Sequence, residues 1–406
     1  MFVHWGQGSK MSVTAIKKSL LLLLCWSALA TVFVLSPLLC SAGEAGKVAY
    51  DLLQMPAFHL KTPEKGKLLD VARAGTRMVA VGENGLIIGS DDSGKTWFQG
   101  SVPMSVTLTA LCFPSPLVGW AVGHDGIILH TSDGGATWIR QIDGSQINRG
   151  AYEQVEKLYG EKTSPPSSSP TVQFDEYDWM NLEVYLRDIE QMKKEGSVWP
   201  FLDVWFADDQ KGFAVGAFGM AVRTSDGGKT WNPFMNRLPN PKGLHYYAVA
   251  KVGSDLFIAG EEGQVLRSED DGQNWKQLDS PYDGSFFGIM GTHSGDDVIA
   301  FGLRGHGFIS RDRGDTWEPL KLPEGGPWMS GMVLNDGSVL LISPVLGGYI
   351  STDNGLSFAG VPGFPMAAVA AMGTPGNGLL TVGVLGTQIV QAGGILSNKV
   401  VQGAKK

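Results

Sequence analysis

The chain has 406 residues, with 32 Lys and Arg against 40 Asp and Glu, and its 55 Gly and 12 Trp are typical of a protein rich in strands and turns. The net charge of −8 argues against general electrostatic binding to nucleic acid or to an anionic membrane surface. Of the three cysteines, only Cys112 lies beyond residue 40, which excludes an internal disulfide framework.

The N-terminus carries an export signal. Lys17 and Lys18 precede an apolar run over residues 20–39, and small residues follow at 41–43. This order is typical of a secretory signal, although the run is also long enough to span a bilayer. We predict that residues 1–42 are a signal peptide or a membrane anchor. Lipid attachment at Cys40 is a third alternative, disfavoured because Leu39 stands where a small residue is expected.

A turn motif of the form Ser/Thr-x-Asp-x-Gly-x-Thr-Trp recurs six times from residue 90 onward. Successive aspartates are 41, 93, 44, 42 and 41 residues apart, so one unit of about 42 residues repeats with a single interruption. The motif matches the Asp box, or BNR repeat, and we interpret it as a structural hairpin turn. One Asp per unit cannot converge on a single metal ion. The motif residues are Asp92, Trp97, Asp133, Trp138, Asp226, Trp231, Asp270, Trp275, Asp312, Trp317 and Asp353.

A second phrase precedes each Asp box: an alternating apolar stretch that ends in a glycine-bounded turn, as in VAVGENG at 79–85. Seven copies occur, the last near residues 380–390 without an Asp box. Four strand-like segments in each unit predict an all-β, seven-bladed β-propeller over residues 48–396. The seventh copy stops after its third strand, so we expect residues 48–53 to supply the fourth strand and close the last blade.

The interruption is an insertion at residues 143–194, between blades 2 and 3. Helix-like stretches at 151–159 and 177–194 flank a Ser/Pro-rich segment at 163–170. The insertion either covers the side of the propeller or forms an element that docks a partner. The connection between blades emerges on the face that carries the glycine-bounded turns, opposite the Asp boxes. We therefore place the candidate partner-binding face there, with Glu83, His124, Asp125, Phe218, Glu261, Glu262, Arg304 and His306.

No catalytic set can be assembled from the sequence. A sialidase needs an arginine cluster, a Tyr–Glu nucleophile pair and an acidic Asp, but only Arg304 sits in a turn on the candidate face. The seven histidines are scattered without metal-binding spacing. We predict no enzyme activity, no cofactor and no metal site.

The repeated unit, best seen at residues 119–138, resembles the photosystem II stability/assembly factor family. This resemblance covers residues 48–390 apart from the insertion. It implies an exported, non-catalytic propeller on the periplasmic or lumenal side of a membrane that serves as an assembly factor for a membrane protein complex. We expect a monomer that binds a subunit of a complex similar to photosystem II. The alternatives are a sialidase-type glycoside hydrolase and a periplasmic accessory protein of an envelope transporter.

Overall fold

Seven antiparallel sheets follow one another along the chain in the computed structural model, which describes residues 51–159, 176–196, 198–374 and 378–391. Six sheets have four strands in sequence order, and the seventh has three. Blades 1 to 3 are β1 (Leu68–Ala74), β2 (Arg77–Gly82), β3 (Ile87–Ser90), β4 (Phe98–Gln99); β5 (Leu108–Cys112), β6 (Gly119–Gly123), β7 (Ile128–Thr131), β8 (Ile139–Ile142); and β9 (Phe201–Phe206), β10 (Gly212–Gly216), β11 (Ala221–Thr224), β12 (Asn232–Pro233).

The remaining four sheets repeat this order, with a long first strand and a short outer strand. Blades 4 and 5 are β13 (Tyr246–Val252), β14 (Asp255–Gly260), β15 (Val265–Ser268), β16 (Lys276–Gln277); and β17 (Phe286–Gly291), β18 (Val298–Gly302), β19 (Gly307–Ser310), β20 (Glu318–Pro319). Blades 6 and 7 are β21 (Ser330–Val333), β22 (Val339–Ser343), β23 (Gly347–Ser351), β24 (Ala359–Gly360); and β25 (Ala368–Thr374), β26 (Gly378–Gly383), β27 (Gly386–Gln391).

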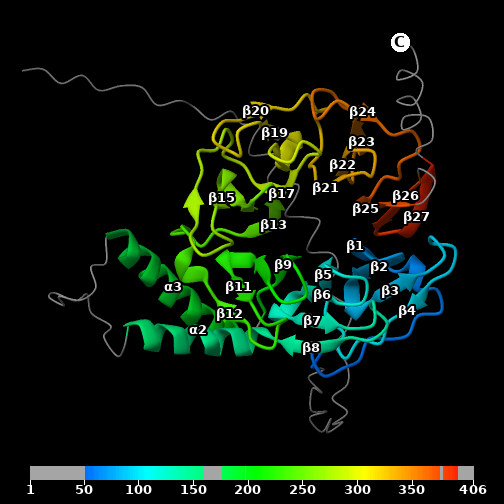
Figure 1. Ribbon diagram of the computed structural model, residues 1–406. Helices are drawn as coiled ribbons and strands as arrows, with labels where there is room; N and C mark the ends of the chain where they lie inside the picture. The colour runs from blue at the N-terminus through cyan, green and yellow to red at the C-terminus, as the bar shows by residue number, and fades with distance from the viewer. Residues whose placement is uncertain (1–50, 160–175, 197, 375–377, 392–406) are drawn as a thin grey trace, which may run out of the picture. The chain divides into compact units, whose positions relative to one another are not determined.

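The first strands of the seven sheets close a ring. Each of β1, β5, β9, β13, β17, β21 and β25 contacts the first strand of the next sheet, and β25 contacts β1 (Figure 1). Apolar clusters fill the spaces between neighbouring blades; one joins Leu68 and Met78 of blade 1 to Leu380 and Val382 of blade 7. These residues alternate along their strands, as a sheet packed on its neighbours requires. The predicted seven-bladed β-propeller is confirmed.

The last blade is not closed as predicted. Its sheet has three strands, and the described part of the predicted fourth strand, from Asp51 onward, is a turn. Ser105 N donates to Leu52 O at 2.9 Å and Ala57 N donates to Val102 O at 3.1 Å, so this segment pairs with the connection between blades 1 and 2. These bonds pair the backbone of the segment with that connection and not with blade 7. The predicted closing of blade 7 by this segment was therefore wrong. Residues 48–50 lie outside the described residues.

The insertion forms two helices, α2 (Gly144–Tyr159) and α3 (Glu176–Glu195), which contact each other (Figure 1). The first helix begins seven residues earlier than predicted. Asp143 Oδ1 accepts bonds from the backbone of Ser145 and Gln146, while Gln146 Oε1 accepts a bond from Asp143 N at 3.1 Å. This reciprocal capping box fixes the start of the helix. Within the described ranges, no helix is long and apolar enough to cross a membrane.

The two faces of the ring carry different turns. The turn face carries the turns between second and third strands, namely η2 (Glu83–Gly85), η3 (His124–Gly126), η4 (Ala217–Gly219), η6 (Glu261–Gly263) and η7 (Leu303–Gly305), together with the connections between blades. The Asp-box face carries the turns between third and fourth strands. Because α2 contacts η3, the insertion lies at the edge of the turn face. Two further 3-10 turns are η1 (Pro63–Lys65) and η5 (Met235–Arg237).

Candidate partner-binding site

The Asp-box carboxylates are occupied by hydrogen bonds within their own turns. Asp133 accepts bonds from Thr131 Oγ1 at 2.8 Å, Ala136 N at 3.0 Å, Thr137 N at 2.9 Å and Thr137 Oγ1 at 2.7 Å. The bonds from the first Ser or Thr and from the backbone and side chain four residues on recur at the other five boxes. They lower the pKa of each Asp, to about 2 at Asp92 and Asp270. These carboxylates hold their turns and offer little to a ligand.

The predicted turn-face residues fall into separate groups. Glu83 pairs with Lys67 at 2.5 Å, and Glu262 pairs with Lys242. His124 is exposed beside the half-buried Asp125, whose pKa is raised by burial. Each of these residues is tied to a local partner or stands in its own turn, so the structure does not gather them into one site.

Arg304 and His306 share a second location, on blade 5. The His306 ring lies 4.5 Å from the ring of Tyr282, and the Tyr282 hydroxyl donates to Leu303 O at 3.2 Å. Burial raises the pKa of Tyr282, and the nearby Arg304 opposes the rise. This part of the turn face therefore presents a cation next to two rings in tilted contact.

Phe218 and Glu261 are brought together by His245. The Phe218 ring, 43% exposed, lies 4.5 Å from the His245 ring, and Glu261 Oε2 lies 3.0 Å from His245 Nδ1. Phe218 N donates to His245 Nδ1 at 3.4 Å. Glu261 Oε2 accepts a bond from the backbone N–H of His245 at 2.8 Å, so His245 is tied to both residues.

A continuous row of rings links this cluster to the axis of the propeller. Trp199, in the connection that follows α3, lies 4.5 Å from Phe218. On the other side His245 lies 6.1 Å from Tyr247, which lies 5.1 Å from Phe287 of the next blade. Burial and the neighbouring Glu261 raise the pKa of Tyr247 to about 12, so its hydroxyl stays protonated as a donor. We call these five residues the aromatic row.

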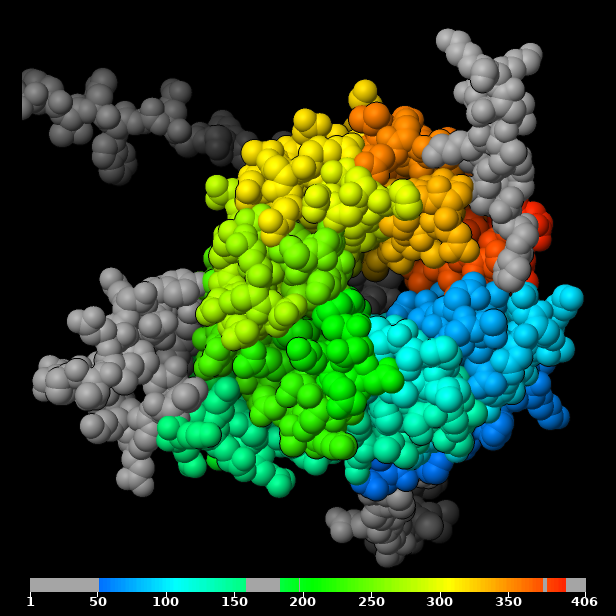
Figure 2. Space-filling view, viewed as in Figure 1, coloured from blue at the N-terminus to red at the C-terminus, as the bar shows by residue number. Residues whose placement is uncertain are grey.

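The aromatic row ends at an axial cavity of about 260 Å³, bordered by first-strand residues of all seven blades. Figure 2 shows the surface hollowed where the blades meet. Two carboxyls border this cavity: Asp70 accepts bonds from Val71 N and Leu111 N, and Asp203 from Val204 N and Val249 N. Each carboxyl thus joins the first strands of two neighbouring blades.

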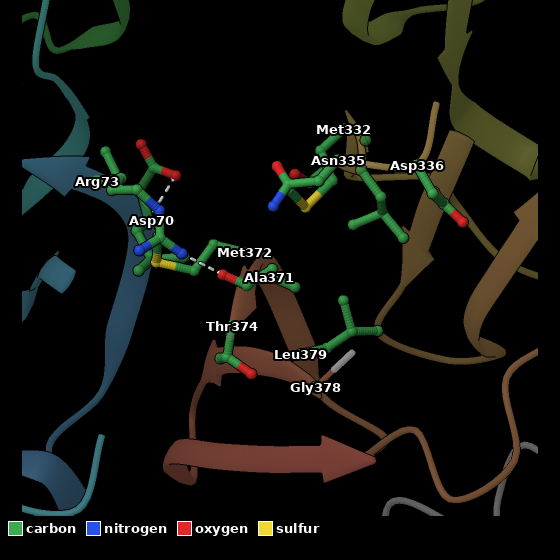
Figure 3. A pocket seen from close by; sticks show the side chains of 16 residues that line it. Asp70, Arg73, Met332, Asn335, Asp336, Ala371, Met372, Thr374, Gly378 and Leu379 are labelled. Carbon is green, nitrogen blue, oxygen red and sulfur yellow. Dashed lines mark hydrogen bonds between the residues drawn. The ribbon is translucent and has the colours of Figure 1, made fainter. Parts of the chain in front are cut away.

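A second cavity of about 340 Å³ opens nearer the Asp-box face, between blades 6, 7 and 1. Asp70 and Arg73 lie on one wall, with Met332 and Asn335 opposite (Figure 3). Arg73 donates to the carbonyl oxygen of Gly373, which ties blade 1 to blade 7. Both cavities are lined by apolar and backbone groups beside few charges, and neither gathers an acid, a base and a nucleophile.

The arginines near the Asp-box face are all engaged. Arg77 pairs with Asp91, Arg311 with Asp297, and Arg313 with Asp255, while the buried Arg267 lies among Asp255, Glu269 and Asp315. None of these forms the free arginine cluster that a sialidase uses for its substrate carboxylate.

The described residues also offer neither a metal site nor a reactive thiol. Over the described ranges, no group of three or more His, Cys, Asp or Glu side chains could hold a metal ion. Burial raises the pKa of Cys112 to about 12, so its thiol stays protonated and unreactive.

The glycine-bounded turns, on which the predicted site rests, contain Phe218 but neither the rest of the aromatic row nor the axial carboxyls. Tyr247 and Phe287 are the second residues of β13 and β17, where these strands bulge, whereas Asp70 and Asp203 are the third residues of β1 and β9 and follow a bulge. An aromatic residue at the second position or an aspartate at the third was the available signal, and four of the seven first strands carry it.

Comparisons with known proteins support this fold. The family model described as "Photosynthesis system II assembly factor YCF48" matches residues 54–163 and 187–320, more than half of the chain. The gap between the two matched ranges lies within the insertion. The match thus covers the blades on either side of it.

Relatives in the curated proteins match over short segments. The chain is 39% identical over 77 residues to "Photosystem II assembly lipoprotein Ycf48" of Synechococcus sp. (strain CC9902), and 29% identical over 83 residues to "Photosystem II stability/assembly factor HCF136, chloroplastic" of Arabidopsis thaliana. Each match covers 19% of this chain, but only 23% and 20% of those relatives.

Solved structures match over most of the chain. The structure "YCF48 bound to D1 peptide" matches with a TM-score of 0.54 and 15% identity, covering 82% of this chain and 98% of that one. YCF48 from Cyanidioschyzon merolae matches with a TM-score of 0.54 and 12% identity, over 80% and 95% of the two chains. At these identities the likeness shows the fold alone.

Proposed function

The chain belongs to the family described as photosynthesis system II assembly factor YCF48, and from this premise we propose that it is an exported, non-catalytic assembly factor for a membrane protein complex. Its partner in this proposal is a polypeptide segment of a complex subunit, exposed on the periplasmic or lumenal side. A structure of similar fold holds a D1 peptide, which makes peptide capture the natural activity to test.

The observation that carries the proposal is the aromatic row. Five rings in contact lead from Trp199, through the exposed Phe218, to Phe287 at the axial cavity, across three blades. Aromatic residues with a polar tip are enriched at protein interfaces because they bury a large apolar area and still satisfy a hydrogen bond. The row therefore suits an extended peptide with apolar side chains.

Charged groups beside the row would fix the direction of such a peptide. Glu261 is held by His245 and faces Tyr247, whose hydroxyl lies 3.4 Å away. Arg304 stands on the next blade, beside the Tyr282 and His306 rings. An acidic and a basic group on neighbouring blades can bind groups of opposite charge at two points along one extended chain.

The same face could serve an accessory protein of a transporter, and only the identity of the partner separates the two functions. A glycoside hydrolase is disfavoured by the paired arginines and by the absence of an acid–nucleophile arrangement at either axial cavity. Capture of the partner is therefore the decisive experiment.

We propose to place a photoreactive benzoylphenylalanine at Phe218 in the full chain, within its native host. Leu356 serves as the control, because it is a 65% exposed apolar residue on the Asp-box face. Irradiation should link position 218, and not position 356, to one membrane-complex subunit, and Tyr247→Ala should lower the yield at least fivefold. Equal labelling from both positions would overturn the proposal, as would labelling confined to transporter subunits.

A further inference from the structure

The turn face is not uniform around the ring. In blades 1, 2, 4 and 5 its turns carry charged or histidine side chains, whereas the turns of blades 6 and 7, at residues 343–347 and 383–386, carry none. The connection between these two blades, residues 361–367, is also uncharged. The turn of blade 3, at 217–219, is uncharged too, so blades 6 and 7 differ in being two adjacent blades whose turns and shared connection all lack charge. Glu64 and Lys65 of η1 lie against Gly386 at the edge of this sector.

This sector exposes large apolar side chains. Leu385 is 64% exposed, Met366 55%, Val345 49%, Val384 48% and Met329 38%. We call these five residues the blade 6–7 patch. Soluble proteins expose single apolar residues commonly, but a group of neighbouring ones marks an interaction surface.

The members of the patch are neighbours in space. Ala367 N donates to Pro344 O at 2.8 Å, which places the turn of blade 6 beside the segment that holds Met366. Met366 and Leu385 border the same shallow depression, and Met329 N donates to Ile342 O beside that turn. The patch thus extends from the rim of the axial cavity across two adjacent blades.

The shape of the patch indicates what covers it. Its side chains stand on turns, and the depression between Met366 and Leu385 holds only about 10 Å³. A volume of about 10–15 Å³ on this measure is needed to hold a single water, so no partner side chain fits there. Protruding apolar side chains without a receiving pocket suit a fluid apolar phase better than a shaped protein surface.

The path of the chain supports the same occupant. Residues 52–57 pair with the connection between blades 1 and 2, on the turn face. Eleven residues, 40–50, separate the apolar run at 20–39 from residue 51. Eleven residues reach at most about 40 Å. A membrane-held run would therefore keep the turn face close to the bilayer.

The other end of the chain is less suited to cover the patch. The last strand, β27, begins beside the patch at Gly386 and ends at Gln391, where it pairs with Gly378. Its end thus lies toward the Asp-box face, so the residues that follow start from the side of the ring opposite the patch.

We propose that the blade 6–7 patch inserts into the headgroup region of a lipid bilayer and turns this face of the propeller toward the membrane. The contact is apolar: a patch without charges inserts into zwitterionic lipid and needs no anionic headgroups. Leu385 and Val345 enter the bilayer, while the charged turns of blades 1, 2, 4 and 5 remain in water.

The test places benzoylphenylalanine singly at Leu385, Val345 or Leu356 in the full chain, bound to phosphatidylcholine vesicles. Leu356 is the matched control, 65% exposed but on the Asp-box face. After irradiation, covalent lipid adducts are measured by mass spectrometry. We expect adduct yields at 385 and 345 at least fivefold above that at 356.

Two results would overturn the inference. One is an adduct yield at 385 and 345 no higher than at 356. The other is labelling of 385 by a protein in native membranes with no lipid adduct in vesicles, which would assign the patch to a protein partner. The vesicles contain no partner protein, so failure here leaves the proposed assembly function intact, and failure to capture a subunit through Phe218 leaves the lipid contact intact.

Discussion

The two axial carboxyls predict an unusual dependence of stability on pH. Burial raises the pKa of Asp70 and of Asp203 from 3.8 to about 7, and the backbone N–H groups that each carboxyl accepts from oppose this rise. A carboxyl with a raised pKa in the folded state stabilises the fold fully below its unfolded pKa and loses that contribution as pH rises through its folded pKa. The fold should therefore weaken between about pH 4 and pH 7.

The size of the effect follows from the shift in pKa. A rise of about three units corresponds to roughly 4 kcal/mol per carboxyl. Both side chains, however, are only partly buried by surface area and border a cavity of about 260 Å³, large enough for several waters. Water there hydrates the ionised form, so we expect roughly 2 kcal/mol per carboxyl. The two are coupled, because the charge of Asp70 raises the pKa of Asp203.

Urea unfolding from pH 5 to pH 8 measures this effect in the wild type, in Asp70→Asn, in Asp203→Asn and in the double variant. Asparagine keeps the size of the side chain but cannot ionise. It also loses one acceptor, which lowers stability at every pH, so the slope against pH is the measurement. The Asp-box carboxylates, with lowered pKa, titrate below this window. Burial lowers the pKa of His130, but that contribution cancels in the difference between variants.

The wild type should lose about 2–4 kcal/mol relative to the double variant as the pH rises from 5 to 8. Each single variant should lose less than the wild type. Parallel curves for the wild type and the double variant would refute the reasoning, because they would show that both carboxyls are ionised and hydrated throughout.

Three substitutions test other parts of the structure by thermal and urea unfolding. Asp133→Ala removes four accepted hydrogen bonds and should lower the free energy of unfolding by about 1–3 kcal/mol. The control is Asp209→Ala, which removes a carboxylate at the same face for which no hydrogen bond is seen and should change the free energy of unfolding by less than about 0.5 kcal/mol. Gln141→Leu leaves two indole N–H groups without the Oε1 that accepts both and should cost about 2–4 kcal/mol; no loss would mean that water replaces the amide. Ile189→Ala should cost about 2–4 kcal/mol and Glu190→Ala almost nothing, and equal small losses would show that α3 does not stabilise the propeller.

The repeat made the blades predictable because each blade is a local unit. Strand alternation, the Asp-box turn and the glycine-bounded turn all lie within about 42 residues, and only a ring buries both faces of every such unit. The start of α2 is also determined by local sequence, through the capping box from Asp143 to Gln146. Apolar periodicity alone does not reveal this start.

Ring closure and the candidate site depend on distant contacts instead. Whether residues 51–57 join blade 7 or the connection after blade 1 is decided by backbone bonds to Val102 and Ser105, and both choices satisfy the same apolar pattern. The aromatic row draws its rings from the connection that follows α3 and from blades 3, 4 and 5. No single repeat contains it, so no single repeat could reveal it.

The insertion packs beside the aromatic row, although its two helices supply none of the five rings. Tyr185 and Ile189 of α3 pack with α2, and Met192 joins the apolar cluster between blades 2 and 3. The apolar side of this helix is therefore buried against α2 and the propeller. The connection that follows α3 supplies the buried Trp199, whose indole donates to Glu195 at the end of α3 and whose ring packs on Phe218. The end of α3 thus orients the first ring of the aromatic row, over blade 3, while the uncharged patch lies over blades 6 and 7. If both proposals hold, one sector of a single face contacts lipid while another receives the segment of a membrane protein that emerges beside it.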